Sequence, residues 1–382
     1  MEILISVLVL LASSAGLGLF VESLGIPHIV GELSAGIIIG PALLGLISYS
    51  PQLSSIASIA LFFIILLIGI EATSEMLTKN PLRSAALSIM SFIIPSFLLF
   101  AVSYLGFGLP LVSCAIIGVA IGVPSISVVS ILILKYGLLR KSGGQSILAS
   151  VVFSDIAAFV ILALLSGSSN IWLLLVGLLA FAAVLLVIDS LIIKHKLRIS
   201  RIFGSLRKTE RGETAAFSLV IVAGLVISSL LQLIGITYIL GAFFAGLLIS
   251  RAVVGARMFH MLKNTFRRLN NSFFIPIFFS IAGLEVSRIG YNYILLLASL
   301  LVTGFISIFL IGYAWSLTKG HDMKYTSTIA LLGGRGAVGI AISSIAFSAG
   351  LINGSMYSVI VLATVGLSII LPPLLRGQKP IR

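Results

Sequence analysis

Apolar stretches of about 20 residues alternate with short polar segments along the whole 382-residue chain. Because an α-helix rises about 1.5 Å per residue, each stretch can cross a hydrocarbon core of roughly 30 Å. The pattern predicts thirteen membrane-spanning helices, at residues 3–23, 27–47, 54–75, 81–105, 111–135, 141–167, 171–193, 213–231, 236–251, 269–285, 290–317, 325–348 and 353–375. The first stretch lacks the basic start of a signal peptide, so we interpret it as a retained helix.

Composition agrees with this pattern and excludes a water-soluble fold. Hydrophobic residues make up 59% of the chain and charged residues 9%, whereas about a quarter of a soluble domain is charged. The excess of Lys and Arg over Asp and Glu, 24 against 11, does not indicate nucleic acid, because the basic residues lie between apolar spans. The single cysteine excludes an intrachain disulfide. We expect no cofactor, no nucleic-acid partner and no enzymatic activity.

The basic residues define a direction across the membrane. One set of alternate loops carries 22 of the 24 basic residues, the opposite set carries Arg288 alone, and Arg335 falls inside a span. The positive-inside rule then places the N-terminus outside and the C-terminus in the cytoplasm of a multi-pass protein of the cell membrane. A wrong number of spans would scramble this alternation, so it supports thirteen.

Three short motifs recur at nearly one offset. "IVGELSAGIII" at 29–39 matches "ILGAFFAGLLI" at 239–249, and "GIEAT" at 69–73 matches "GLEVS" at 283–287. "GVPS" at 122–125 interrupts the fifth span as "GGRG" at 333–336 interrupts the twelfth. A shift of seven spans reverses the direction of the second copy. The chain therefore divides into a first inverted repeat at 1–167, a linker helix and cytoplasmic loop at 168–212, and a second repeat at 213–382.

This organisation predicts an all-α polytopic membrane protein of about 13 transmembrane helices. Two inverted-topology six-helix repeats would bring their discontinuous helices to a crossing at the midplane, which is a secondary-transporter architecture. Tight helix packing alone accounts for the recurring glycines. It does not account for Pro124 and Arg335 at equivalent breaks.

One carboxylate lies where the bilayer is driest. Asp155 is about 21 Å from Lys141 and about 18 Å from Gly167 along a helix. An ionised carboxylate there costs several kcal/mol unless it is paired, hydrated or protonated. It can therefore hold either a proton or a hard cation, and this competition is the chemistry of proton–cation exchange. The alternative is a structural carboxylate paired with a neighbouring helix.

The other polar groups inside the spans are candidates for supporting roles. Arg335 stays charged and needs a carboxylate or the carbonyl end of a broken helix; it is either a structural brace or a substrate contact. Ser125 and Ser127 follow the Pro124 break, where they could ligate a cation or satisfy the backbone. Glu71 could reach a cavity open to the cytoplasm. The remaining acids nearer span ends are interpreted as interface or funnel residues: Glu32, Asp189 and Glu285.

Six segments resemble the monovalent cation–proton antiporter superfamily, and specifically its sodium/hydrogen exchangers of bacterial and archaeal type without a nucleotide-binding domain. They are "GIPHIVGELSAGIIIGPALLGLI" (25–47), "LFFIILLIGIEAT" (61–73), "VVFSDIAAFVILALL" (151–165), "GITYILGAFFAGLLISR" (235–251), "FFIPIFFSIAGLEVS" (273–287) and "GGRGAVGIAI" (333–342). The resemblance implies a homodimer with a mobile core, and it implies that the aspartate of the "DI" step, Asp155, carries the ion.

The departures from the family pattern refine this expectation. Electrogenic members carry a second aspartate where this chain has Ser154, and a lysine where it has Phe305. Electroneutral members resemble the chain better, with an arginine at the position of Arg335. In some of them this arginine pairs with an acid at the position of Ser150, which leaves the partner of Arg335 open. Pro124 replaces a threonine that is frequent at the first break.

The sequence thus predicts an antiporter that exchanges protons for a monovalent cation, one for one, with a role in pH homeostasis. Na⁺ is the first candidate, with K⁺ or Li⁺ as alternatives, and the cation would bind at Asp155, supported by Ser154, Ser125, Ser127, Pro124, Glu71 and Arg335. A potassium efflux system and an ion-coupled organic-anion symporter of related fold stay open. A channel and an intramembrane aspartyl protease are more remote.

Overall fold

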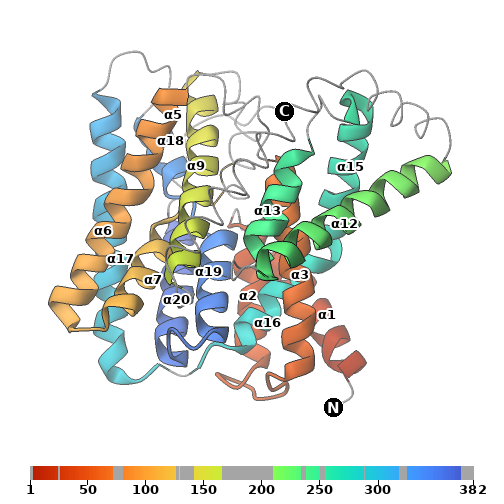
Figure 1. Ribbon diagram of the computed structural model, residues 1–382. Helices are drawn as coiled ribbons and strands as arrows, with labels where there is room; N and C mark the ends of the chain where they lie inside the picture. The colour runs from red at the N-terminus through yellow and green to blue at the C-terminus, as the bar shows by residue number, and fades with distance from the viewer. Residues whose placement is uncertain are drawn as a thin grey trace. The chain divides into compact units, whose positions relative to one another are not determined.

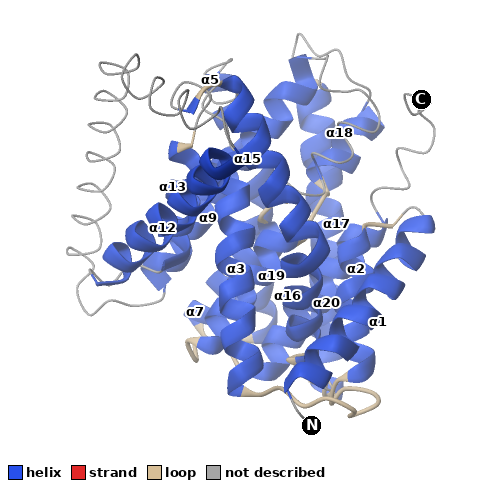
Figure 2. Cartoon of the chain, turned by 90° about the vertical axis from the view of Figure 1, so that its right-hand side faces the viewer, coloured by secondary structure: helices blue, strands red, loops and turns tan. Residues whose placement is uncertain are grey.

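The computed structural model describes residues 3–24, 26–71, 81–125, 129, 142–165, 210–233, 238–249, 254–287, 289–317 and 325–370 (Figure 1). Within these ranges the chain forms helices joined by short loops, and no strand occurs (Figure 2). A helix satisfies its backbone N–H and C=O groups within its own segment, which an apolar environment demands.

The first half of the described chain consists of α1 (Ile3–Ser23), α2 (His28–Ile39), α3 (Pro51–Glu71), α5 (Pro81–Ser88), the π-helical η1 (Ile89–Ile93), α6 (Ile94–Ala101), the π-helical η2 (Val102–Gly106), α7 (Leu111–Gly122) and α9 (Ser142–Leu165). The second half consists of α12 (Glu210–Leu233), α13 (Tyr238–Leu248), α15 (Ala256–Leu269), the π-helical η4 (Asn270–Phe274), α16 (Ile275–Leu284), α17 (Tyr291–Ser316), α18 (Tyr325–Leu332), α19 (Ala337–Ser348) and α20 (Gly354–Ile370).

Every predicted span except 171–193, which lies outside the described residues, overlaps a described helix, although the span 27–47 is helical only over residues 28–39. Within the described residues, six helices are long and apolar enough to cross a membrane alone: α1, α3, the continuous helix at 82–106, α9, α12 and α17. The multi-pass, all-helical class is therefore confirmed. The total of thirteen stays a prediction.

One loop prediction is wrong. The basic stretch before the tenth span was expected to be a cytoplasmic loop, but α15 occupies residues 256–269 and continues through η4 into α16. Its apolar side chains Met258, Phe259, Leu262 and Phe266 recur at helical spacing and are buried. Its Lys and Arg residues belong to an amphipathic helix, whose polar positions resemble a loop when only charge is counted.

The described helices group into two compact units. The first comprises Met1–Ala57, Met76–Ser166 and Pro276–Arg382, and the second comprises Ser58–Glu75 and Gly167–Ile275. In the first unit α9 packs beside α5, and α19 packs between α7 and α20 (Figure 1). This grouping follows packing, and it leaves the division by repeats at residues 167 and 212 as a prediction.

Glycines permit direct backbone contact where helices cross within each unit. In the first unit a β-carbon on Gly36 of α2 would overlap the carbonyl oxygen of Ser280 in α16, and one on Gly283 would overlap that of Leu33. In the second unit Gly69 of α3 meets the carbonyl of Phe243, and Gly246 of α13 meets that of Leu66. The glycines of the repeated motifs thus lie at helix crossings, where any larger residue would separate the backbones.

Candidate functional site

Two interrupted helices meet in the first unit. α7 ends at Gly122, and the chain continues in extended backbone at Val123. α18 ends at Leu332, and four residues separate it from the start of α19 at Ala337. The backbone N–H of Ser125 donates a hydrogen bond of 2.7 Å to the carbonyl oxygen of Gly334. The two breaks predicted from "GVPS" and "GGRG" are therefore in direct contact.

Arg335 joins this contact through its side chain. Its Nη1 donates a hydrogen bond to the carbonyl oxygen of Gly122, the last residue of α7. The last carbonyls of a helix have no partner within the helix and form the negative end of its dipole. The guanidinium therefore caps the C-terminal end of α7, which is one of the two partners that the sequence analysis left open.

The backbone of Arg335 is bonded to α20. Ser368 of α20 donates a hydrogen bond of 2.6 Å to its carbonyl oxygen. Its Nε has no hydrogen-bond partner among the described residues, although only 1% of the residue is exposed. Arg335 also lines a cavity of about 10 Å³, with Pro27, Thr364 and Ser368. That space is about what one water molecule needs.

Asp155 lies in the middle of α9 and is fully buried. Neither carboxylate oxygen has a hydrogen-bond partner among the described residues. The structure therefore supplies no partner for a structural carboxylate within this part of the chain. A buried ionised carboxylate without a partner is costly in an apolar environment.

The serines before Asp155 are engaged elsewhere. Ser154 shares a hydrogen bond of 2.9 Å with Ser88 of α5 and donates a second bond, also of 2.9 Å, to the carbonyl oxygen of Ser150. Ser150 in turn donates to the carbonyl oxygen of Ile147 at 2.7 Å. These hydroxyls tie α9 to α5 and to its own preceding turn.

Glu71 has partners that sequence reasoning missed. At the end of α3, its Oε1 accepts hydrogen bonds from Nε of Arg267, at 3.0 Å, and from Nη2 of the same guanidinium. Nζ of Lys263 lies 4.0 Å away. Both Lys263 and Arg267 belong to α15, where the sequence analysis predicts a loop. The i, i+4 spacing of Lys263 and Arg267 was the signal that could have indicated one helical face.

The remaining predicted residues have mixed placements. Ser125 is fully buried at the contact between the breaks, whereas Ser127 and Asp189 lie outside the described residues. Phe305, half-buried in α17, packs against Ile308 and Ile329. Glu32 is buried with its Oε2 unpartnered within the described chain. Glu285 is 9% exposed and accepts a hydrogen bond of 3.3 Å from Ser344.

The fold and this site define a multi-pass membrane protein in which two interrupted helices pack against the helix that carries a buried carboxylate, since both α7 and α19 contact α9. The sequence model of the family described as "Sodium/hydrogen exchanger, transmembrane" matches residues 8–377. The chain therefore belongs to the sodium/hydrogen exchanger family, a family of transporters.

The sequence is similar to those of named antiporters along nearly the full length of both chains. The chain is 27% identical over 361 residues to the Na(+)/H(+)-K(+) antiporter GerN of Bacillus cereus, covering 92% of this chain and 90% of GerN. It is 26% identical over 360 residues to the Na(+)/H(+) antiporter of Enterococcus hirae, covering 92% and 91%. The solved structure of the sodium proton antiporter MjNhaP1 from Methanocaldococcus jannaschii at pH 8 superimposes with a TM-score of 0.71 at 18% identity, covering 99% of this chain and 98% of that one. This structural likeness shows that the two proteins share a fold.

Proposed function

We propose that this chain exchanges protons for a monovalent cation by alternating access, with Asp155 as the shared site. The observation that carries the proposal is the full burial of Asp155 with both carboxylate oxygens unpartnered among the described residues. Such a group is stable in the membrane only with a bound proton or a bound cation. Each turnover then carries one or the other, and coupling follows from competition for a single group.

The stoichiometry that fits this site is electroneutral, one proton for one cation. Ser154 stands at the position where electrogenic members carry a second aspartate, and its hydroxyl already bonds to Ser88 and to the carbonyl oxygen of Ser150. Phe305 contributes an apolar ring where electrogenic members carry lysine. With one titrating carboxylate, the loaded carrier has the same charge in both directions.

Arg335 acts in this scheme as a positioning residue. Its bond to the carbonyl oxygen of Gly122 holds the interrupted helices together and offsets the negative end of α7. This engagement also counts against an organic-anion symporter, in which the guanidinium would have to be free for the substrate. Ser125 and Pro124 contribute oxygen atoms and freed carbonyls near the breaks, and Ser127 completes the proposed supporting set.

Inverted repeats at 1–167 and 213–382, linked through 168–212, form the proposed mechanical basis of alternating access. The crossing glycines support this symmetry. Gly36 and Gly246 are 210 residues apart, and Gly69 and Gly283 are 214 apart. The contact of α2 with α16 therefore has its equivalent in the contact of α13 with α3. We further propose a homodimer, with the N-terminus outside and the C-terminus cytoplasmic.

Sodium is the first candidate for the cation, with lithium as an alternative, and the name of the Bacillus cereus relative gives specific reason to test potassium. Purified protein in proteoliposomes, with internal pH followed by a dye at clamped voltage, separates these cases. We expect proton movement on addition of Na⁺, K⁺ or Li⁺, without current.

The Asp155→Asn variant should reduce this exchange to the level of empty liposomes. A carboxamide neither gains nor loses a proton near neutral pH, and it has no negative charge to hold a cation. Asp189→Asn, which removes the other aspartate of a predicted span, is the matched control and should retain exchange. Exchange that persists in Asp155→Asn would overturn the assignment of the site. A current that accompanies wild-type exchange would overturn the one-for-one stoichiometry.

A further inference from the structure

A second buried carboxylate lies at the far end of α16, separate from the Asp155 site. Glu285 follows α16 directly and is 9% exposed. Ser344 of α19 donates a hydrogen bond of 3.3 Å to its Oε2. Tyr49, in the loop between α2 and α3, and Tyr357 of α20 also lie within hydrogen-bonding range of the carboxylate. Four segments of the first unit thus converge on one acid.

The partners of Glu285 are hydroxyls. Among the described residues, the ionisable groups that face it are Tyr49 and Tyr357, and no Lys, Arg or His is one of its partners. Burial raises the pKa of Tyr49, in its loop outside the helices, to about 12, so its hydroxyl stays protonated. Arg288, three residues further along, lies outside the described residues. Within the described chain, therefore, nothing positively charged neutralises this carboxylate.

The hydrogen bond of Tyr357 adds a geometric constraint. Its hydroxyl donates to the carbonyl oxygen of Ala282 at 2.7 Å, which uses its single proton. Its oxygen therefore faces the Glu285 carboxylate as an acceptor. Two oxygen acceptors are stable next to each other only when a proton or a cation lies between them. The carboxylate, the phenolic oxygen and the Ser344 hydroxyl provide the oxygen ligands that hard cations prefer.

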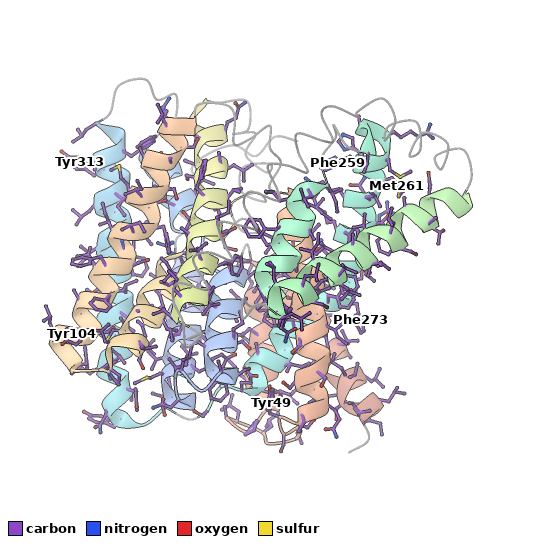
Figure 3. The ribbon with its side chains drawn as sticks, viewed as in Figure 1. Tyr49, Tyr104, Phe259, Met261, Phe273 and Tyr313 are labelled. Atoms are coloured by element: carbon purple, nitrogen blue, oxygen red, sulfur yellow. The ribbon has the colours of Figure 1, made fainter. Side chains whose placement is uncertain are left out.

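This cluster is in reach of solvent on one side. Tyr49 is 37% exposed and lies beside the end of α16 (Figure 3). Its neighbours Ser48 and Ser50 line a cavity of about 460 Å³, together with Ser6 and Gln52. Ser344 lies eight residues after Gly336, which places it about 12 Å along α19 from the break that Arg335 occupies.

We propose that Glu285, Tyr49, Ser344 and Tyr357 form a second monovalent-cation site at the external mouth of the protein, where a cation and a proton exchange on the Glu285 carboxylate. Binding of the cation releases the carboxyl proton, so the site is neutral in both states. For the class of ligand and the side of the membrane, the proposal rests on the proposed function. Its location and its residues are independent of Asp155.

Cation-dependent thermal stability of the purified full-length chain tests this site without transport. Asp155→Asn removes the first site, so any remaining stabilisation by NaCl over choline chloride at equal ionic strength reports a second one. We expect Asp155→Asn to keep a sodium-dependent rise in Tm, and Asp155→Asn/Glu285→Gln to lose it. Asp155→Asn/Glu71→Gln, which removes the equivalent acid of the other repeat, should keep it. Loss of the whole sodium effect in Asp155→Asn alone would overturn the proposal.

A milder variant covers the case in which Glu285→Gln does not fold. Tyr49→Phe leaves the carboxylate in place and removes one partly exposed hydroxyl, and in the Asp155→Asn background it should weaken apparent sodium affinity about tenfold, as expected for a lost interaction of about 1.4 kcal/mol. In oriented proteoliposomes, Glu285→Gln alone should raise KM for sodium on the external side and leave the internal KM unchanged. Equal changes on both sides, or unchanged affinity in Tyr49→Phe, would contradict the site. Exchange activity of Asp155→Asn bears on the proposed function alone.

Discussion

In the first unit α2 crosses α16 at Gly36 and Gly283, and in the second unit α13 crosses α3 at Gly246 and Gly69. Both crossings bring backbone against backbone. In both, an acid lies two residues after the glycine of one helix: Glu285 directly follows α16, and Glu71 is the last residue of α3. The chemistry around the two acids differs. Glu71 is held by the guanidinium of Arg267, whereas Glu285 is surrounded by hydroxyls.

This difference separates what packing requires from what ion handling requires. The glycines have the same steric role in both places, because a β-carbon fits neither crossing. The acids are free to diverge, since each lies at a helix end where neighbouring segments supply the partners. An arginine neutralises Glu71 permanently, while hydroxyls leave Glu285 able to bind a proton or a cation.

The largest effect should come from the crossing glycines themselves. Gly36→Ala and Gly246→Ala should each lower the free energy of unfolding by about 1–3 kcal/mol, because the added methyl group forces the backbones apart. Chemical unfolding of the purified protein measures this change. Gly16→Ala in α1, where no atom lies within 4 Å of the new carbon, is the control and should stabilise by about 0.5–1 kcal/mol. Strongly unequal costs at Gly36 and Gly246 would break the equivalence of the two crossings.

Double-mutant cycles should distinguish the two acids by their response to salt. The coupling of Glu71 with Arg267 should be about 0.5–1 kcal/mol and should fall as ionic strength rises, because the arginine side chain is 39% exposed. The coupling of Glu285 with Tyr49 should be about 0.5–1.5 kcal/mol and nearly independent of salt, because the phenol is neutral. Unfolding of the Glu→Gln, Arg267→Gln and Tyr49→Phe variants at low and high choline chloride provides both values, because choline changes the ionic strength without supplying sodium to the proposed Glu285 site. A similar salt dependence in both cycles would mean that a charged group also faces Glu285.

The smallest effect should be an alkaline one at Tyr49. Burial is the main cause that raises the pKa of this phenol from 10.0 to about 12. The folded state therefore holds the phenolic proton more tightly than the unfolded state does. This contribution to stability is complete below about pH 10 and is lost as the pH rises toward about 12. Tyr49→Phe should lose less stability than the wild type over this range, as followed by Tm against pH.

Tyr291→Phe is the matched control for that measurement, because Tyr291 is 88% exposed at the start of α17. It should follow the wild-type curve. If Tyr49→Phe also followed that curve, the burial that raises the pKa of Tyr49 would not persist in solution.

Much of the fold could be predicted from the chain alone, because the features concerned are local. Length and hydrophobicity determine where a helix can span a bilayer, and each predicted span within the described residues contains a helix. Pro124 and the glycines at 333 and 334 disrupt helices through their own backbone properties, so both breaks were found. The prediction failed for α15, because its basic residues were counted as a loop and its apolar spacing was not examined.

The sequence by itself determined the helical membrane class, the two breaks, the family and the mid-helix position of Asp155, since each follows from residue order over one helix length or from a motif. Only the tertiary structure decided the partners: Gly122 for Arg335, Ser88 for Ser154, Arg267 for Glu71, and Tyr49 with Ser344 for Glu285. The two residues of each pair are separated by 59 to 236 positions along the chain. Which of many polar groups meet across such separations depends on helix packing within each unit. Asp155 is the instructive case, because order along the chain placed it in the middle of a helix, and packing left its oxygens without a partner in the described part of the protein.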